Sequence, residues 1–437
     1  MPKRSFSRGL RLSSILSAGL LLTACASSTD AAGSAGGKPS GSLQFIVSSA
    51  DASDAAFRAV NAAFEKKYPD VKLTFTAIPN DNWAATSASR LAAGNVDITL
   101  AGPQELPPYV PKDSEGDDAR AAEAGVYLDL SKQAFIKRLT PTIMQKTAFK
   151  GKQYVVPTGV SYYTGAYYNK SIFEKNHLAV PTTWDQFVTL CDTLRSKGVT
   201  PLGISGKDTA GLAMLASVQG IYPTAQAKTD LHRTLWTTHT GLTDPKAVQV
   251  LDRVSTMYGY AEKNFAGVPY SALPSGFARG DFAMVPDGTW SSPTIAAAVG
   301  KKFGFGYMPI PTGATAADNA VLGGKVELTL AVPAHARNRT AALAYLDFFT
   351  DPANYKTFAQ LSGFASAEPN IPASAFLDSI SGYTKTFSPA WDTVFITNPK
   401  AGSKAAFPFD YVDVAPLGKA APAQAAAQAE KDWSNAF

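Results

Sequence analysis

The sequence has few of the residues on which disulfide frameworks and metal sites depend. It holds two cysteines and four histidines in 437 residues. Two cysteines cannot build a disulfide framework, and no two histidines stand at a metal-ligand spacing such as His-Glu-x-x-His. We therefore expect no metal site and no cofactor. All four histidines are predicted to lie on the surface or in loops: His177, His232, His239 and His335.

Catalytic motifs are missing as well. Residues 203–206 read Gly-Ile-Ser-Gly and come near the Gly-x-Ser-x-Gly elbow of α/β-hydrolases, but Lys207 stands where the last glycine belongs. Asp208 follows Lys207, which removes a P-loop interpretation. The pattern predicts no catalytic residue. A glycosidase stays open, because its two carboxylates can lie far apart in the sequence.

The body of the chain lacks a cluster of basic residues. The formal net charge is +5, but Lys3, Arg4, Arg8 and Arg11 all fall in the first 24 residues, which hold no acid. Without these four, 36 basic and 35 acidic side chains remain. Nucleic-acid binding requires a clustered basic face, so we expect no nucleic-acid partner.

The apolar run near the N-terminus is too short to span a bilayer permanently. It extends from Leu12 to Ala24, and together with the basic residues before it predicts an export signal over residues 1–24. Residues 22–25 read Leu-Thr-Ala-Cys and resemble a bacterial lipobox, which implies a lipid on Cys25. Residues 25–42 are rich in Ala, Ser and Gly and predict a flexible tether. An ordinary signal peptide is the alternative.

Strands and helices alternate from Leu43 onward. Residues 43–47 are continuously apolar, as in a buried parallel strand. Phe57, Val60 and Phe64 stand at helical spacing, and residues 71–77 have the alternating pattern of another strand. A strand, a helix and a strand at this distance predict a parallel sheet. The length of the chain favours two such lobes.

The stretch from Gly151 to Gly206 is the most informative one. A short apolar run reaches Pro157, where a strand should end because proline has no N–H. Two helices with N-terminal capping boxes come after it. The capping pairs are Ser171 with Glu174 and Thr183 with Gln186. Cys191 lies on the apolar face of the second helix, so we predict a buried thiol there.

This stretch resembles the extracellular solute-binding proteins of bacterial ABC importers, family 1, which includes the maltose-binding type. Four family motifs occur in order: Gly-Lys-x-Tyr-x-x-Pro, Tyr-Asn-Lys-x-x-Phe-x-Lys, Pro-x-Thr-Trp-x-x-Phe and a Leu/Gly-rich turn. Residues 277–290, FARGDFAMVPDGTW, match a further motif, Phe-x-x-Gly-x-x-Ala-Met-x-x-x-Gly-x-Trp. The resemblance covers residues 43–370. A proline that is usual after Gly94 is missing.

The resemblance implies an α/β, periplasmic-binding-protein-like fold of type II. Two α/β lobes would be joined by hinge crossovers near residues 159–163, 323–326 and 349–351. The implied N-lobe comprises residues 43–160 and 326–349, and the implied C-lobe residues 161–325 and 350–437.

The implied function is that of a lipoprotein that captures a carbohydrate by hinge closure and delivers it to the permease of an ABC transporter, without catalysis. We expect a monomer anchored on the extracellular face of the bacterial cell membrane, or a periplasmic protein. A secreted glycoside hydrolase, a sensory module and a binding protein for a non-sugar polar solute are the alternatives. The sequence does not identify the sugar.

A sugar site needs aromatic faces for the C–H face of a pyranose and polar side chains for its hydroxyls. Both kinds of residue follow predicted strands, where ligands bind in α/β sheets. Trp83 and Trp290 could instead belong to the core. The candidate ligand-binding residues are Ser49, Asp51, Asn82, Trp83, Gln104, Glu105, Tyr162, Tyr163, Asp208, Asp287, Trp290, Gly323, Gly324 and Trp391.

Overall fold

A computed structural model describes residues 38–49, 51–401 and 408–437. The predicted export signal, Cys25 and nearly all of the predicted tether lie outside the described residues. Residues 39–437 form one compact unit. No helix among the described residues is both long and apolar enough to cross a membrane.

The first lobe is built on a sheet that starts with a parallel pair. Strand β1 (Gly41–Ser48) pairs with β2 (Val71–Ile78) along its whole length. Helix α1 (Asp51–Lys67) connects the two strands, as the sequence predicts. A parallel bridge between Phe45 and Ile98 pairs β1 with the residues just before β3. The sheet continues through β3 (Thr99–Leu100), β11 (Leu330–Ala331) and β4 (Val155–Val156), which pair in antiparallel fashion.

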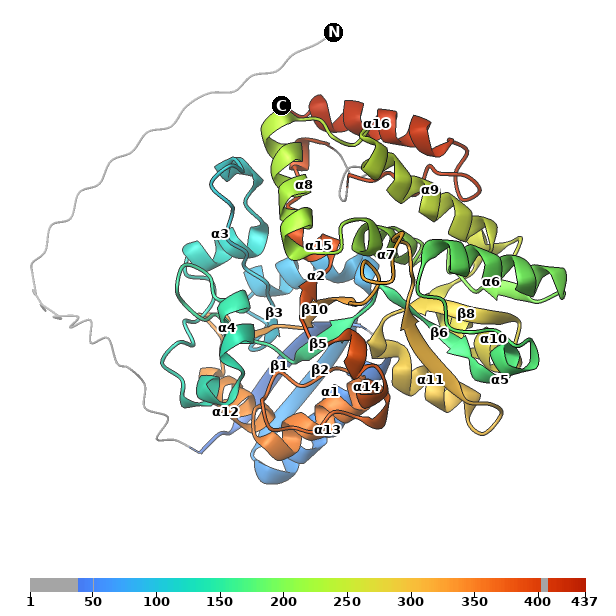
Figure 1. The fold of residues 1–437 in the computed structure, drawn as a ribbon. Helices are drawn as coiled ribbons and strands as arrows, with labels where there is room; N and C mark the ends of the chain where they lie inside the picture. The colour runs from blue at the N-terminus through green and yellow to red at the C-terminus, as the bar shows by residue number, and fades with distance from the viewer. Residues whose placement is uncertain (1–37, 50, 402–407) are drawn as a thin grey trace, which may run out of the picture. The chain divides into compact units, whose positions relative to one another are not determined.

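Helices cover the two faces of this sheet. Because neighbouring residues of a strand point to opposite faces, Phe45 packs with Phe57 of α1 while Ile46 packs with Trp83 of α2 (Asn80–Ala92). Helices α1, α12 (Arg339–Phe349) and α13 (Pro352–Ser362) share the Phe57 side, seen at the bottom of Figure 1. Two short helices, α3 (Asp117–Glu123) and α4 (Pro141–Thr147), lie between β3 and β4 in the chain.

The second lobe holds a four-stranded mixed sheet. Its order is β7 (Thr200–Leu202), β8 (Phe282–Asp287), β6 (Gly165–Asn169) and β9 (Phe305–Pro309). Strand β7 is parallel to β8, whereas β6 is antiparallel to both its neighbours. The main core packs around Trp236, Leu251 and Trp433. Its helices are α6 (Trp184–Ser196), α7 (Gly211–Ile221), α8 (Ala225–Thr238), α9 (Pro245–Gly259) and α16 (Pro422–Ser434).

Shorter elements connect these parts. The remaining α-helices are α5 (Lys170–Lys175), α10 (Leu273–Arg279), α11 (Ser292–Val299), α14 (Ala375–Ser379) and α15 (Trp391–Val394). The 3-10 turns are η1 (Lys112–Ser114), η2 (Ala134–Arg138), η3 (Phe265–Gly267), η4 (Tyr270–Ala272), η5 (Thr289–Ser291), η6 (Ser381–Tyr383) and η7 (Pro399–Ala401).

One half of the predicted capping box forms in α6, whereas Gln186 Oε1 accepts from Thr182 and not from the Thr183 N–H. The predicted cap of α5 is absent. Thr183 caps α6 by accepting the amide of Gln186, and Cys191 is buried there, with its thiol pKa raised by burial. The predicted cap Ser171 is wrong, because Asn169 accepts the amide of Ile172 and α5 starts earlier. Ser171 is already inside the helix that starts at Lys170, so it cannot be the residue before the helix that caps it.

His232 contradicts the prediction that every histidine lies on the surface or in a loop. It belongs to α8 and is 1% exposed. Its ring packs between Phe395 and Trp236. A histidine at an apolar position of a helix is a core residue when both ring nitrogens find partners, and those of His232 do.

Two paired strands lie where the sequence predicts crossovers between the lobes. Strand β5 (Gly159–Tyr162) is antiparallel to β10 (Gly323–Glu327), and β12 (Ser388–Pro389) lies parallel to β10 on its other side. The first two predicted crossovers fall on β5 and β10. The exact lobe boundaries stay a prediction. The packing of α13 favours moving the third boundary beyond residue 362, because the Phe358 ring lies 4.6 Å from that of Phe57.

Glycines allow the crossover strands to approach closely. A Cβ on Gly324 would stand 2.5 Å from the carbonyl oxygen of Ser161, and one on Gly323 would stand 2.7 Å from Oε1 of Gln219. Both distances are far below van der Waals contact. Both glycines, predicted as ligand contacts, are buried: Gly324 lets β10 approach β5, and Gly323 leaves room for the Gln219 side chain of α7.

Lys228 holds β12 in place beside β10. It comes from α8, is 0% exposed, and donates from Nζ to Gln219 Oε1 (2.7 Å), Ser388 Oγ (3.0 Å) and the Pro389 carbonyl (2.8 Å). None of these three partners is charged. Burial therefore lowers the Lys228 pKa to about 8.

We expect Gly324→Ala to destabilise the protein by about 1–3 kcal/mol, because the new methyl group would push β10 away from the Ser161 carbonyl. Gly259→Ala is the matched control, since nothing lies within 4 Å of its Cβ position. That change should alter stability by less than about 1 kcal/mol. Chemical unfolding of both variants measures the difference, and equal stabilities would contradict the close approach of the strands.

The shifted pKa of Lys228 predicts a pH dependence of stability. The native pKa of about 8 lies below the ordinary 10.5, so between these values the unfolded chain binds more protons. The free energy of unfolding should then rise with pH across this window, by up to about 3 kcal/mol. Unfolding of wild type and Lys228→Met at pH 7 and pH 9.5 isolates the effect. A constant difference between the two proteins would contradict it.

Candidate functional site

Two aromatic rings meet where the crossover strands enter the second lobe. Trp290 belongs to η5, directly after β8, and Tyr163 directly follows β5. Their ring centroids lie 5.4 Å apart at an interplanar angle of 38°. Trp290 is partly exposed and also packs against the core of the first lobe. The pair thus stands at the junction of the two lobes.

A buried polar network fixes the Trp290 ring. Its Nε1 donates to the Tyr270 hydroxyl (2.9 Å), and that hydroxyl contacts both carboxylate oxygens of Asp287 at 3.0 Å and Ser291 Oγ at 2.6 Å. Asp208, predicted to contact ligand, instead accepts the backbone N–H of Tyr270 at 2.8 Å. Tyr270, which orients the Trp290 ring, is therefore fixed by hydrogen bonds at its hydroxyl and at its backbone N–H.

Asp287 stabilises the network from inside the protein. It ends β8, is 1% exposed, and accepts the N–H of Gly288 at 2.7 Å. Burial raises the pKa of Asp287 to about 6, although hydrogen bonds from Ser291, Gly288 and Tyr270 act in the opposite direction. The sequence predicts Asp287 as a ligand contact, whereas in this structure its oxygens are occupied by the protein.

Lys325 places a positive charge beside the aromatic pair. Its Nζ lies 5.3 Å from the Tyr163 ring centroid and 5.4 Å from that of Trp290, within cation–π range. Oε1 of Glu327 is 3.5 Å from Nζ, and Tyr163 donates its hydroxyl to Asp392 Oδ1 at 2.5 Å. Burial alone would lower the Lys325 pKa, but the carboxylates of Glu327 and Asp392 outweigh it and raise that pKa. The ammonium group therefore stays charged.

Five side chains of this cluster are not among those predicted from the sequence: Tyr270, Ser291, Lys325, Glu327 and Asp392. Tyr270 lies in a stretch without a motif, and only the fold brings it to Trp290. Lys325 follows the glycine pair predicted as a ligand contact, so the alternation of side chains along a strand could have identified it. Asp392 directly follows Trp391, whose aromatic ring is the more conspicuous feature of that segment.

A pocket of about 590 Å³ forms a separate feature, and none of the residues of the Trp290 cluster lines it. It lies between α2, α3 and residues 395–397, and its volume falls in the range of small-molecule sites. Trp83 and Gln104, both predicted as ligand contacts, line it. Gln104 also donates from Nε2 to the Thr393 carbonyl at 3.2 Å, next to Asp392. Other lining residues are Ser87, Leu91, Leu100, Asp118, Tyr127 and Phe395.

Among the described residues, no contact joins Ser49, Asn82 or Glu105 to this cluster. Ser49 donates to Asp54 Oδ2 at 2.6 Å, and Asn82 is exposed on α2. Glu105 is exposed and accepts the backbone N–H of Lys150. Asp51 is the first residue of α1.

Tyr162 and Trp391 belong to the cores. Tyr162 packs with Tyr307 and Val285 in a buried cluster. Trp391 is 1% exposed and stacks on Phe395 with ring centroids 5.2 Å apart. In this structure Trp391 offers no ring face to a ligand, because aromatic neighbours of the second lobe already cover it.

Comparison with known proteins places the chain in a family. Residues 48–356 match the family model described as bacterial extracellular solute-binding protein. A relative from Streptococcus mutans, named multiple sugar-binding protein, is 25% identical over 305 residues, which cover 68% of each chain.

Solved structures show the same fold. The structure of the solute-binding protein RafE in complex with raffinose has a TM-score of 0.72 at 24% identity and covers 91% of this chain and 99% of its own. A sugar transporter protein from Bacillus licheniformis, solved with stachyose, has a TM-score of 0.71 at 18% identity and covers 91% and 100%. These likenesses confirm the predicted α/β fold of type II, with two lobes joined by crossovers. By the family model that spans residues 48–356, the chain belongs to the bacterial extracellular solute-binding proteins.

Proposed function

We propose that this protein captures a carbohydrate between its lobes and hands it unchanged to the permease of an ABC transporter. The observation that carries the proposal is the fixed, partly exposed Trp290 ring beside Tyr163, with Lys325 and Asp392 next to it. An aromatic face covers the C–H face of a pyranose. A cation and a carboxylate beside it can hydrogen-bond hydroxyl groups. The names of the similar proteins, which mention raffinose, stachyose and multiple sugars, support this choice.

The charge of the site favours a neutral ligand. Lys325 contributes one positive charge, and Glu327 and Asp392 contribute two negative ones close by. A ligand with a carboxylate or phosphate would add to the negative excess in a partly buried place, which is costly. A neutral, hydroxyl-rich ligand brings donors and acceptors without a charge.

Closure of the lobes would follow from the crossover strands. A ligand that contacts Trp290 on one lobe and Gln104 on the other would bind the closed form more tightly than the open one, and it shifts the population by that difference. Strands β5 and β10 would be two of the connections about which this movement takes place. The movement needs no covalent step.

We further propose that the protein is exported as a lipoprotein with its lipid on Cys25 and acts as a monomer at the extracellular face. Catalysis is not part of the proposal. The raised pKa of Asp287 is a feature typical of a general acid. However, Tyr270 and Gly288 occupy its oxygens and bury them. Turnover of labelled oligosaccharides by the purified protein would favour a secreted glycosidase instead.

We expect Trp290→Ala to weaken the binding of the sugar that this protein prefers by about 30-fold or more, since an aromatic residue at the centre of a site contributes about 2 kcal/mol. A thermal-shift screen with raffinose, stachyose and smaller sugars identifies the ligand first. Saturation at about a hundred times the dissociation constant stabilises the fold by about 2.7 kcal/mol. Titration calorimetry of the variant then measures the loss.

Two controls accompany the Trp290 experiment. Trp290→Phe keeps an aromatic face and should lose much less affinity than Trp290→Ala. Leu361→Ala removes an exposed apolar side chain of α13 and should leave affinity unchanged. Full affinity in Trp290→Ala would exclude the aromatic pair as the sugar site.

A further inference from the structure

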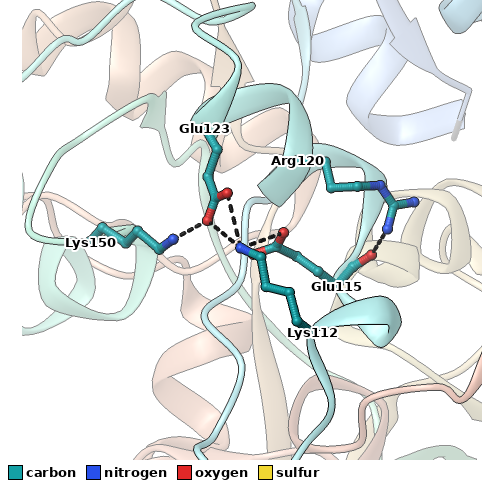
Figure 2. A network of polar contacts seen from close by, with 5 residues as sticks. All are labelled: Lys112, Glu115, Arg120, Glu123 and Lys150. Carbon is teal, nitrogen blue, oxygen red and sulfur yellow. Dashed lines mark hydrogen bonds and ion pairs between the residues drawn. The ribbon is translucent and has the colours of Figure 1, made fainter.

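The segment Gln104–Glu115, which we call the strap, is fastened to the first lobe at both ends. Near its start, Glu105 accepts the backbone N–H of Lys150. Near its end, Nζ of Lys112 contacts Glu123 of α3 at 2.9 Å and Glu115 at 3.1 Å, and Lys150 also pairs with Glu123 (Figure 2). Arg120 of α3 donates to the Glu115 carbonyl.

The middle of the strap lies on the second lobe. Val110 is 6% exposed and packs in the core that holds Trp236. The Tyr109 hydroxyl is 2.8 Å from Nδ1 of His232, and the guanidinium of Arg233 lies 5.3 Å from the Tyr109 ring centroid. Further along the strap, Asp113 pairs with Lys400 at 2.7 Å. The strap therefore contacts α8 and the segment that follows α15.

His232 couples the strap to the wall of the pocket. The N–H of Ile396 donates to Nε2 at 3.1 Å, so Nε2 carries a lone pair and the proton of the neutral ring sits on Nδ1. Nδ1–H then donates to the Tyr109 oxygen. Ile396 lines the pocket of about 590 Å³, as do Gln104 and Leu106 at the start of the strap. Strap, His232 and pocket wall form one connected unit.

Proline makes the strap stiff. Pro107, Pro108 and Pro111 flank the two residues that dock, Tyr109 and Val110. Each proline fixes its own φ angle and restricts the residue before it. A stiff segment loses little conformational entropy on docking. It also transmits movement between its ends, so the middle cannot stay on the second lobe while both ends follow the first lobe away.

We propose that the strap is a latch that holds the lobes closed beside the pocket and that must leave the second lobe when the cleft opens. The purpose of the latch rests on the proposed function, whereas its mechanism rests on the contacts alone. Tyr109 and Val110 are the docking residues, and Lys112 is the anchor on the first lobe. When the latch is weakened, the open form gains population and a bound ligand leaves faster.

The test on the ligand-free protein is small-angle X-ray scattering of the full chain. Tyr109→Ala should increase the radius of gyration relative to wild type, and Tyr109→Phe, which keeps the ring and loses the hydroxyl bond, should increase it less. Leu361→Ala is the control that should change nothing. An unchanged radius in a folded Tyr109→Ala protein, checked by circular dichroism, overturns the latch.

Lys112→Ala tests the latch with Tyr109 in place, so it remains informative if Tyr109→Ala folds poorly. It frees the other end of the strap at an exposed position, so it should also increase the radius of gyration. With raffinose as the probe, dissociation from Tyr109→Ala should be about ten-fold faster than from wild type. A wild type that binds none of the screened sugars would count against the proposed function, whereas the scattering result decides the latch by itself.

Discussion

The antiparallel pairing of β5 with β10 is the constraint on which the site depends. Gly324 faces Tyr162, and Lys325 faces Ser161 across the pair. This register sets where each side chain of the crossover points, because residues alternate along a strand. A slip of one residue would turn Lys325 away from the rings of Tyr163 and Trp290. The close packing at Gly324 makes such a slip difficult, because any side chain there meets the Ser161 carbonyl.

The polar network around Trp290 fixes the orientation of a ring that is only partly buried. Tyr270 is the central member, because it accepts from Trp290 and contacts Asp287 and Ser291. Burial disfavours the charged form of Asp287, as its raised pKa shows. Burying this carboxyl group destabilises the folded protein, yet the group accepts several hydrogen bonds. Such an arrangement is typical of a functional site, where side chains are held in a fixed orientation at the expense of stability.

Structure that is local, or that a motif determines, could be predicted from the sequence. The cap at Thr183 and the burial of Cys191 follow from residues within one turn of a helix. The motif ending in Trp290 placed that ring correctly after β8. The parallel pair of β1 and β2 followed from period and length alone.

The failure at His232 concerns a contact between residues far apart in the chain. His232 meets Tyr109, 123 residues before it, and no spacing within the sequence could reveal that. Ser171 failed for a different reason, since Asn169 competes for the same helix start and precedes it along the chain.

The crossover strands and the strap impose different conditions on the same movement. A hinge of paired strands keeps its backbone hydrogen bonds while the lobes rotate, so it contributes little to the difference between open and closed forms. Contacts that exist only in the closed form set that difference instead. Under the proposed latch, Val110 in the second core and the Tyr109–His232 bond would be contacts of this kind. The equilibrium between the forms would then depend on a proline-rich loop that carries none of the family motifs.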